Sequence, residues 1–404
     1  MFKLLRGVRA ICPEDRGKVD ILLAFDRIAY IGTGLHFPQS LEVEEFDCNG
    51  MTAIPGLIDG HVHICGGGGE GGPQTRTPEI TLSELTAAGI TTVVGCLGTD
   101  AVTRSMAGLL AKAKGLEVEG ITTYIYSGAY QVPTRTLLNT LREDLALIEK
   151  VVGAGEIAIS DHRSAQPQIE ELTKLAAEAR VGGMLGDKAG VVHIHLGEGQ
   201  RGLSPINQIL EETEIPITQF VPTHVNRNRR LFEQGLEFLA RGGRIDLTAG
   251  GDDLEEGVKI PEALAEIFAK GLAIENVTVS SDGNGSLPLF DQQGNLTGLA
   301  KGSVQVLWQD LARTVHETQL SLEQAVPLVT SNVAKVLKLV RKGRLEQGYD
   351  ADLVLLDAEL QIQQVYAKGR LMVDQGQPIV FGTFEAGEKE KAPQNRVLQG
   401  EQIS

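Results

Sequence analysis

The chain has 404 residues and a formal net charge of −16, with 37 Lys and Arg against 53 Asp and Glu. This charge argues against nucleic acid and against an anionic membrane surface as partners. The four cysteines form no CxxC pair, and no apolar run reaches the roughly 18 residues that a membrane helix needs. Because the N-terminus is also too mixed in polarity for a signal peptide, we expect a cytoplasmic protein.

The two ends of the chain have a similar β-like character. Residues 1–55 contain short alternating patterns, among them KVDILLAFDRIAYIG and EVEEFDCNGMTAIPG, and residues 344–384 contain RLEQGYDADLVLLD and IQQVYAKGRLMVDQG. Two such segments that flank one large unit predict a single small β-sandwich domain built from both ends. Residues 385–404 are polar and have no apolar period, so we expect them to be disordered.

Residues 56–343 alternate short apolar runs with amphipathic, helix-like stretches. Eight strand-then-helix units predict an α/β fold with a closed (β/α)8 barrel, and an open doubly wound sheet is the structural alternative. No run is followed by GxGxxG, so dinucleotide binding has no support. The expected barrel strands are 57–64, 91–97, 122–127, 156–160, 191–196, 217–223, 244–249 and 276–281.

Histidine and acidic residues gather at the ends of these strands, and active sites of such barrels form at the carboxyl ends. His61 and His63 can both point into the barrel mouth, because side chains alternate along a strand. An isolated HxH is a weak signal, but four of the eight histidines fall at strand ends. The remaining members of the set are His195 at the end of the fifth run, His224 after the sixth, Asp282 after the eighth and Glu156 at the opening of the fourth.

Four imidazoles and two carboxylates suit two divalent metal ions, with zinc favoured and manganese or cobalt as alternatives. Two metals need a shared anionic ligand that holds them roughly 3.5–4 Å apart, and together they lower the pKa of a bridging water. A metal-bridging hydroxide could then attack a carbonyl. Asp282 could act as general base and acid, accepting the proton of the water and passing it to the leaving amine. The sequence therefore predicts metal-dependent hydrolysis.

HVH after LIDG, with the later histidines and SSD, resembles the amidohydrolase superfamily. Within it, the chain is similar to the bacterial isoaspartyl dipeptidases over about residues 1–384. The resemblance implies hydrolysis of the isopeptide bond of β-aspartyl dipeptides by a homo-oligomer, an octamer built from dimers. The matching segments are GLIDGHVHICGGGGEGGPQTRTPE, TTVVGCLGTD, SGAYQVPTRT, ISDHRSA, PTHVNRN, SSDGNGS and VYAKGRLMV.

The resemblance also implies a role for each residue of the site. Tyr130 would hydrogen-bond the carbonyl oxygen as it becomes an oxyanion. Metal ligands would be His61, His63 and Asp282 for the first ion, and His195 and His224 for the second.

Other residues would hold the substrate. Glu70 would pair with its free α-ammonium, while Arg163 and Arg227 would grip carboxylate with their planar guanidinium groups. The carboxylate of the aspartyl moiety would be held by Ser286, Thr99 and the backbone of Gly68. One acidic and two basic side chains also match the charges of an isoaspartyl dipeptide, which carries one ammonium and two carboxylates.

The chain departs from the family pattern at the fourth strand, where a lysine carboxylated by CO2 usually bridges the metals. Seven residues before Arg163 stands Glu156. A glutamate carboxylate lies about three bonds nearer the backbone than a lysine carbamate, so the strand or the metals must shift by a few ångström. We expect Glu156 to bridge the metals directly and without CO2. The alternative is a site with a single metal.

His193 shares a strand face with His195, and we expect it one layer deeper, as a hydrogen-bond donor near the metal ligands. Two other functions remain open. A related amidohydrolase for N-acyl amino acids or cyclic amides would have less use for Glu70, because a cyclic imide offers no ammonium. A non-catalytic scaffold on the same fold would be expected to lose its metal ligands. The histidines and Asp282 are all present here, and only Glu156 in place of lysine is compatible with such a scaffold.

Overall fold

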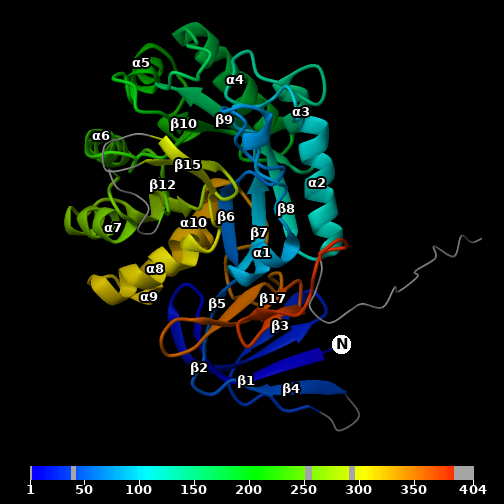
Figure 1. Ribbon diagram of the computed structural model, residues 1–404. Coiled ribbons are helices and arrows are strands. Elements are labelled where there is room, and N and C mark those ends of the chain that lie inside the picture. The colour runs from blue at the N-terminus through cyan, green and yellow to red at the C-terminus, as the bar shows by residue number, and fades with distance from the viewer. Residues whose placement is uncertain (1, 38–41, 251–256, 291–295, 386–404) are drawn as a thin grey trace, which may run out of the picture.

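A computed structural model of the chain describes residues 2–37, 42–250, 257–290 and 296–385. It has two parts, a barrel in the upper half of Figure 1 and a β-domain in the lower half. Residues 386–404, which make up nearly all of the segment expected to be disordered, lie outside the described residues.

Eight parallel strands form the barrel, which confirms the predicted fold class. Strands β6 to β11 are hydrogen-bonded in chain order, and β12 pairs with β13. β12 lies beside β11, and β13 returns to β6 through the bridge between Val62 and Gly283, so the ring closes. The strands are β6 (Leu57–Val62), β7 (Ile90–Gly95), β8 (Thr122–Ser127), β9 (Val151–Ile159), β10 (Val191–Leu196), β11 (Phe220–Thr223), β12 (Ile245–Thr248) and β13 (Val277–Ser280).

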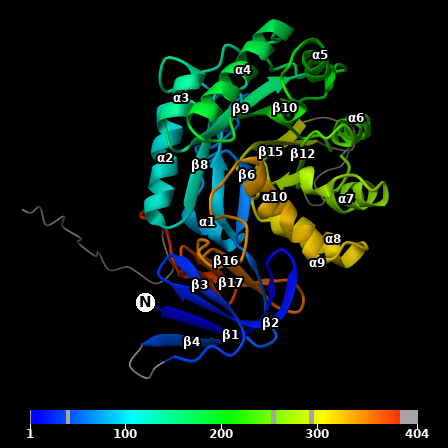
Figure 2. The same cartoon turned by 180° about the vertical axis from the view of Figure 1, so that it is seen from behind.

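Helices surround the barrel, and their ends follow from the sequence (Figure 2). α1 and α3 each begin with a capping box, in which Thr81 and Thr140 exchange hydrogen bonds with the glutamate three residues on. The main helices are α1 (Leu82–Ala87), α2 (Met106–Glu119), α3 (Leu141–Leu147), α4 (Ile169–Leu185), α5 (Ser204–Glu212), α6 (Arg229–Ala240), α7 (Ile260–Ala269), α8 (Val306–Glu317), α9 (Leu322–Ala325) and α10 (Ser331–Val336).

Both chain ends build the second part, as predicted. β5 pairs antiparallel with β16, which joins the N-terminal and C-terminal strands in one sheet of order β19-β18-β17-β16-β5-β1-β2-β3, with β4 parallel to β1. Its own core contains Val8, Ile21 and Leu353, all fully buried. The strands are β1 (Phe2–Ile11), β2 (Asp15–Ala24), β3 (Arg27–Gly32), β4 (Val43–Asp47), β5 (Thr52–Pro55), β16 (Leu353–Leu356), β17 (Ile362–Ala367), β18 (Arg370–Asp374) and β19 (Gln377–Pro378).

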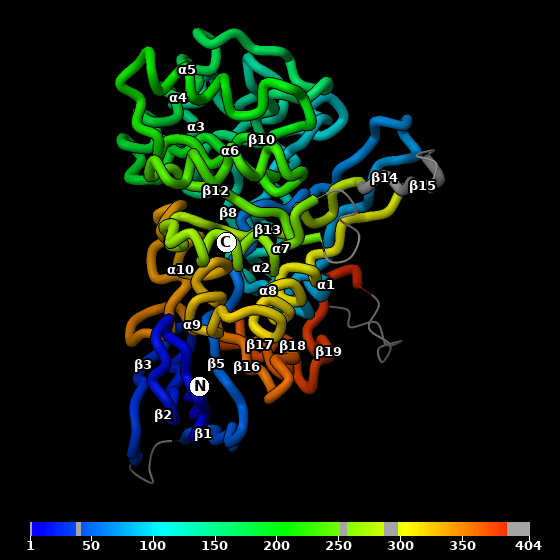
Figure 3. The backbone as a smooth tube through the Cα atoms, turned by 90° about the vertical axis from the view of Figure 1, so that its left-hand side faces the viewer, coloured from blue at the N-terminus to red at the C-terminus, as the bar shows by residue number. Residues whose placement is uncertain are grey.

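A hairpin of β14 (Ser286–Phe290) and β15 (Leu296–Lys301) follows the last barrel strand and projects from the barrel (Figure 3). Its base contacts the glycine-rich loop that follows β6, where the backbone N–H of Gly67 donates to the carbonyl of Asn284. The two segments therefore form one side of the barrel mouth.

Several strand boundaries differ from the expectation, most of all the start of β9. β9 begins at Val151, so the expectation that Glu156 opens the strand is wrong, and this residue lies inside it. All nine residues of β9 are buried, and two glycines interrupt its apolar run, so neither alternation nor β-propensity marks its start. A 3-10 turn (Ile217–Gln219) precedes β11, and β6 ends at Val62, one residue before His63.

No helix in the described ranges combines the length and the apolar character that a bilayer span requires.

Candidate active site

The six predicted metal ligands converge inside the barrel mouth. His61 lies on β6, Glu156 on β9 and His195 on β10, while the other three follow their strands directly. His224 and Asp282 both have left-handed backbone, with φ of 60° and 51°, where each chain leaves its strand. Non-glycine residues adopt this region at a cost, and such residues cluster at functional sites.

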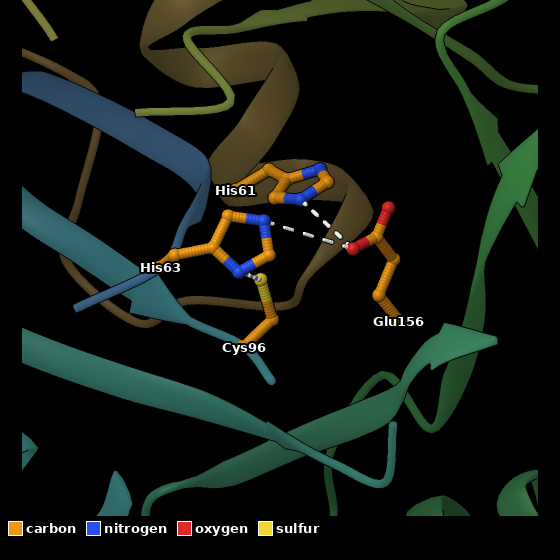
Figure 4. Close-up of side chains that lie close together, drawn as sticks. All are labelled: His61, His63, Cys96 and Glu156. Atoms are coloured by element: carbon orange, nitrogen blue, oxygen red, sulfur yellow. Dashed lines mark hydrogen bonds and ion pairs between the residues drawn. The ribbon is translucent and has the colours of Figure 1, made fainter. Parts of the chain in front are cut away.

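One group of ligand atoms contains His61, His63, Glu156 and Asp282. The Nε2 atom of His61 lies 3.4 Å from Glu156 Oε2, and that of His63 lies 3.9 Å from the same oxygen (Figure 4). Asp282 Oδ1 lies 3.4 Å from His61 Nε2 and 3.2 Å from His63 Nε2. In a tetrahedral zinc site the ligand atoms are about 3.3 Å apart, given bonds of roughly 2.0–2.1 Å. These spacings therefore fit a metal ion at the centre of the group.

A second group contains His195, His224 and the other oxygen of Glu156. Glu156 Oε1 lies 2.7 Å from His195 Nδ1 and 3.1 Å from His224 Nε2. The two carboxylate oxygens of Glu156 thus face different pairs of imidazoles. This second group is compact enough to hold an ion, as are two sets around His61, one with His63, Cys96 and Glu156 and one with His224 and Asp282.

Two atoms of this cluster are buried without a hydrogen-bond partner in the described part of the chain, His61 Nε2 and Glu156 Oε2. Buried polar atoms without partners are costly, and a metal ion between them would satisfy both. The residues present therefore fit a metal site.

The carboxyls of the cluster are ionised, while its imidazoles differ in their pKa values. Burial opposes ionisation of Glu156, but the imidazoles of His61 and His195 outweigh it and hold the pKa of this carboxyl well below its ordinary value. The same balance, with His63 as the main hydrogen-bonding neighbour, lowers the pKa of Asp282. Burial lowers the pKa of His224 to about 3. Neighbouring thiol and carboxyl groups outweigh burial at His61 and His63 and raise their pKa values well above the ordinary value. Carboxylate and neutral imidazole are the forms that bind metals, so metal binding at these two histidines would release protons.

Each histidine of the cluster has a further partner at its other ring nitrogen. His193 Nε2 lies 3.0 Å from His61 Nδ1, deeper in the barrel as expected. If His61 binds metal through Nε2, its Nδ1 carries the hydrogen, and His193 would then accept this hydrogen bond instead of donating it. The other pairs are His63 Nδ1 with Cys96 Sγ at 3.7 Å, His195 Nε2 with Asp161 Oδ2 at 2.9 Å, and His224 Nδ1 with Thr248 Oγ1 at 2.7 Å.

Above the ligands lies a cavity of about 580 Å³. The cavity brings together all the residues that the sequence analysis assigns to substrate, together with Tyr130, whose hydroxyl is 2.8 Å from His195 Nδ1. Its lining includes Gly68, Glu70, Thr99, Tyr130, Arg163, Arg227, Asp282 and Ser286.

Charged side chains face one another across this cavity. Glu70 accepts a hydrogen bond from Thr99 Oγ1 at 2.8 Å and lies 3.4 Å from Arg163 Nη1. Arg227 donates to the carbonyl of Leu196, and it forms no ion pair with any carboxylate of the described residues. A cation in a cavity without a counter-ion is available to an anionic ligand.

The glycine-rich loop after β6 has close backbone packing. A Cβ at Gly68, where φ is +69°, would lie 2.5 Å from the carbonyl oxygen of Thr75, so only glycine fits. Buried Arg104 donates to the carbonyl oxygens of Cys65, Gly67 and Thr77. This arginine holds the loop in place, and the sequence analysis did not single it out.

Sequence reasoning also missed Asp161, Cys96 and Thr248, the partners of three histidines. Asp161 stands in the segment ISDHRSA, two residues before an arginine that was assigned a role, so its position was the available signal. Nothing in the local pattern marks Cys96 or Thr248, because their contacts join different strands.

The barrel and its histidine–carboxylate cluster are those of a hydrolase of the amidohydrolase type, and the chain belongs to the Amidohydrolase family, whose model matches residues 52–388. More narrowly, the chain resembles the β-aspartyl dipeptidase of Fervidobacterium islandicum AW-1, solved in complex with β-Asp-Leu dipeptide. The identity is 46%, the match covers 94% of this chain and 98% of that chain, and the TM-score is 0.86. The resemblance found in the sequence is thereby confirmed.

Curated relatives are more distant or shorter in overlap. A dihydroorotase of Pelotomaculum thermopropionicum is 25% identical over 408 residues, which covers 89% of this chain and 90% of that protein. An N-acetylglucosamine-6-phosphate deacetylase of Lysinibacillus sphaericus is 37% identical, but the chain spans only 20% of its length.

Proposed function

We propose that this protein hydrolyses β-aspartyl (isoaspartyl) dipeptides with two divalent metal ions, most simply zinc. The observation that carries the proposal is the cavity of about 580 Å³, which places one acidic and two basic side chains around a cluster of metal ligands. The similarity to the Fervidobacterium dipeptidase supports the same substrate class.

Glu156 would bridge the two ions directly. This is supported by its two oxygens, since Oε2 faces His61 and Oε1 faces His195. Because Glu156 is buried among the ligands and ionised, its own carboxylate would supply the anionic bridge without CO2. When bound, the two ions would polarise the scissile carbonyl and activate the attacking water.

The substrate would lie with its aspartyl end toward the glycine-rich loop. Glu70 would take the α-ammonium in exchange for its contact with Arg163, which would then turn its free N–H groups to a carboxylate. Arg227, without an acidic partner of its own among the described residues, would take carboxylate directly. The aspartyl carboxylate would be held by Ser286, Thr99 and the backbone of Gly68.

Two side chains would move or hold protons. Asp282 is ionised, so it can accept a proton from the attacking water and pass it to the leaving amine. Burial, together with the charge of Glu156, raises the pKa of Tyr130 well above its ordinary value. Tyr130 therefore keeps its proton and can donate a hydrogen bond to the developing oxyanion.

Hydrolysis assays with β-Asp-Leu and α-Asp-Leu test the proposal. We expect the zinc-loaded protein to cleave β-Asp-Leu selectively, because the α-peptide carries its ammonium one bond nearer to the scissile carbonyl, away from the position that Glu70 would contact. A chelator-treated sample that regains activity with zinc is the control. Opening of dihydroorotate without cleavage of either peptide would replace the proposal by a cyclic amidase, which the full-length match to a dihydroorotase makes the second candidate.

A homo-oligomeric state, an octamer built from dimers, remains a prediction that light scattering on the purified protein can test. The cytoplasmic location also remains a prediction.

A further inference from the structure

Asp161 is a buried carboxylate that follows β9, with its side chain 5% exposed. Within the described part of the chain, its carboxylate accepts four hydrogen bonds, which come from two residues. Oδ2 accepts from His195 Nε2 at 2.9 Å and from Arg163 Nη2 at 2.8 Å. Oδ1 accepts from the Arg163 Nε atom at 3.0 Å and from its backbone N–H at 2.7 Å. The carboxylate therefore joins a metal ligand to a residue of the substrate cavity.

The contact with His195 fixes how this imidazole is presented. Its Nδ1 lies 2.7 Å from Glu156 Oε1 and its Nε2 faces Asp161, so the hydrogen belongs on Nε2 when Nδ1 binds metal. A carboxylate behind a metal-binding histidine sets the tautomer and the ring orientation, and raises the basicity of the ligand.

The contact with Arg163 fixes the guanidinium on the other side. Two parallel N–H donors meet the two oxygens of Asp161, the strongest geometry for such a pair. The guanidinium carbon lies 5.5 Å from the ring centre of Tyr130, and Nη1 lies 3.4 Å from Glu70. One N–H edge is thus anchored while the other faces the cavity.

Close packing holds Asp161 itself in place. A Cβ at Gly197 would lie 2.4 Å from Asp161 Cβ, so glycine is required on the neighbouring strand end for this carboxylate to sit where it does.

We propose that Asp161 is a positioning residue that couples the second metal position, at His195 and His224, to the grip of Arg163 on a substrate carboxylate. This inference rests on the proposed function. Its consequence is that a single change weakens two properties, metal affinity on one side of Glu156 and recognition of one substrate group, because both depend on the same carboxylate.

The test replaces Asp161 by Asn, which keeps the shape and removes the charge. Zinc affinity is measured by chelator competition, and KM is measured for β-Asp-Leu and for β-Asp-leucinamide, which lacks the leaving carboxylate. We expect Asp161→Asn to lose about 10–100-fold in affinity for one of two zinc ions, the usual effect of removing such a partner. KM should rise more for β-Asp-Leu than for the amide.

Asp100→Asn is the matched control for metal binding. Asp100 lines the same cavity and lies 3.2 Å from Arg104, but it forms no hydrogen bond to a predicted metal ligand among the described residues. It should keep both zinc affinities. Gly197→Ala is a second variant, which keeps the carboxylate but displaces it, and should weaken the same zinc ion.

Unchanged affinity of both ions in Asp161→Asn, or equal weakening of both together with a lowered melting temperature, would overturn the inference. So would an equal rise in KM for the two substrates. A wild-type protein that binds two zinc ions but does not cleave β-Asp-Leu would overturn the proposed function, and the two zinc affinities of the variant would still decide the metal half of the inference. A wild-type protein that binds fewer than two ions would overturn both, which the wild-type sample alone reveals.

Discussion

The barrel interior contains carboxylates in two layers, and their pKa values are lowered in one layer and raised in the other. The mouth layer consists of Glu156, Asp282 and the four histidines that face them. The floor layer lies beneath it and contains Asp59, Asp246 and His193. Glu156 of the mouth layer is as buried as Asp59 and Asp246 of the floor layer, so burial alone does not decide what a carboxylate does there. The side chain of Asp282 is 23% exposed.

The difference lies in the donors. In the floor layer, Asp59 accepts from the Ser281 hydroxyl at 2.5 Å and from backbone N–H groups. Asp246 accepts from three hydroxyls, those of Thr223, Thr278 and Ser280, at 2.5–2.7 Å. Neutral donors offset only part of the cost of ionising a buried carboxyl. Burial therefore raises the pKa of both carboxyls, that of Asp59 to about 6.

In the mouth layer the neighbours are imidazoles, and the pKa values of the carboxyls fall instead. His61, His193 and Asp246 are also close enough together to suggest an ion. However, hydroxyls occupy the Asp246 oxygens, and His193 Nε2 pairs with His61 Nδ1. A metal site needs lone pairs without other partners. Among the described buried carboxylates of the two layers, such a lone pair lies on Glu156 Oε2 in the mouth layer.

The largest expected effect comes from Glu156→Gln. Removing the charge removes the shared anionic ligand, so we expect loss of at least one ion per chain and near-complete loss of hydrolysis. Elemental analysis and the β-Asp-Leu assay measure both. The matched change in the floor layer, Asp246→Asn, should keep two ions per chain and cost roughly 1–3 kcal/mol of stability, as expected for a disturbed buried hydrogen-bond network. Equal metal loss in the two variants would break the distinction between the layers.

Asp282→Asn should leave a protein that folds but turns over slowly. Loss of the group that moves the proton lowers kcat by about 10²–10⁴-fold. Steady-state kinetics checks this, with the near-ultraviolet spectrum as a folding control. A kcat within a few-fold of wild type would assign the proton transfer to another group.

Tyr130→Phe should lower kcat by about 10²–10³-fold, the usual cost of one oxyanion donor. KM should change little, because the hydrogen bond strengthens only as charge develops. The reverse pattern, a raised KM at constant kcat, would make Tyr130 a binding residue instead.

The smallest effect is a pH dependence of stability from the floor layer. Burial raises the pKa of Asp59 from 3.8 to about 6, so between these values the folded protein binds more protons than the unfolded chain. The stabilising contribution is present below the lower value and is lost as pH rises through the upper one. This amounts to roughly 3 kcal/mol. Urea unfolding of the metal-free protein at pH 4 and pH 7 should show the loss, which Asp59→Asn should lack. Parallel pH profiles would contradict it.

The ligands of the mouth layer can be predicted from the sequence, because a parallel barrel brings residues at strand ends together wherever they stand in the chain. His61, His195 and Asp282 are predictable in this way. The start of β9 is not, since a fully buried strand with two glycines shows no alternation, and Glu156 was assigned to the strand's opening.

The contacts between the ligands and their partners cannot be predicted from local sequence pattern, although the position of Asp161 beside Arg163 was a signal for that residue. Asp161, Cys96 and Thr248 each contact a histidine from another strand, and Arg104 reaches carbonyls up to 39 residues away in the chain. Such contacts depend on strand register and side-chain direction, which a sequence motif does not specify. The same holds for the floor layer, whose hydroxyl donors look like ordinary strand residues.

The proposed bridging of two metals by Glu156 can be observed directly. A crystal structure of the zinc-loaded protein, with anomalous scattering measured at the zinc edge, tests it most directly. We predict two peaks, one bound by His61, His63 and Asp282 and the other by His195 and His224, with one Glu156 oxygen about 2.0–2.2 Å from each ion. A single peak, or a Glu156 carboxylate turned away from either ion, would contradict the claim.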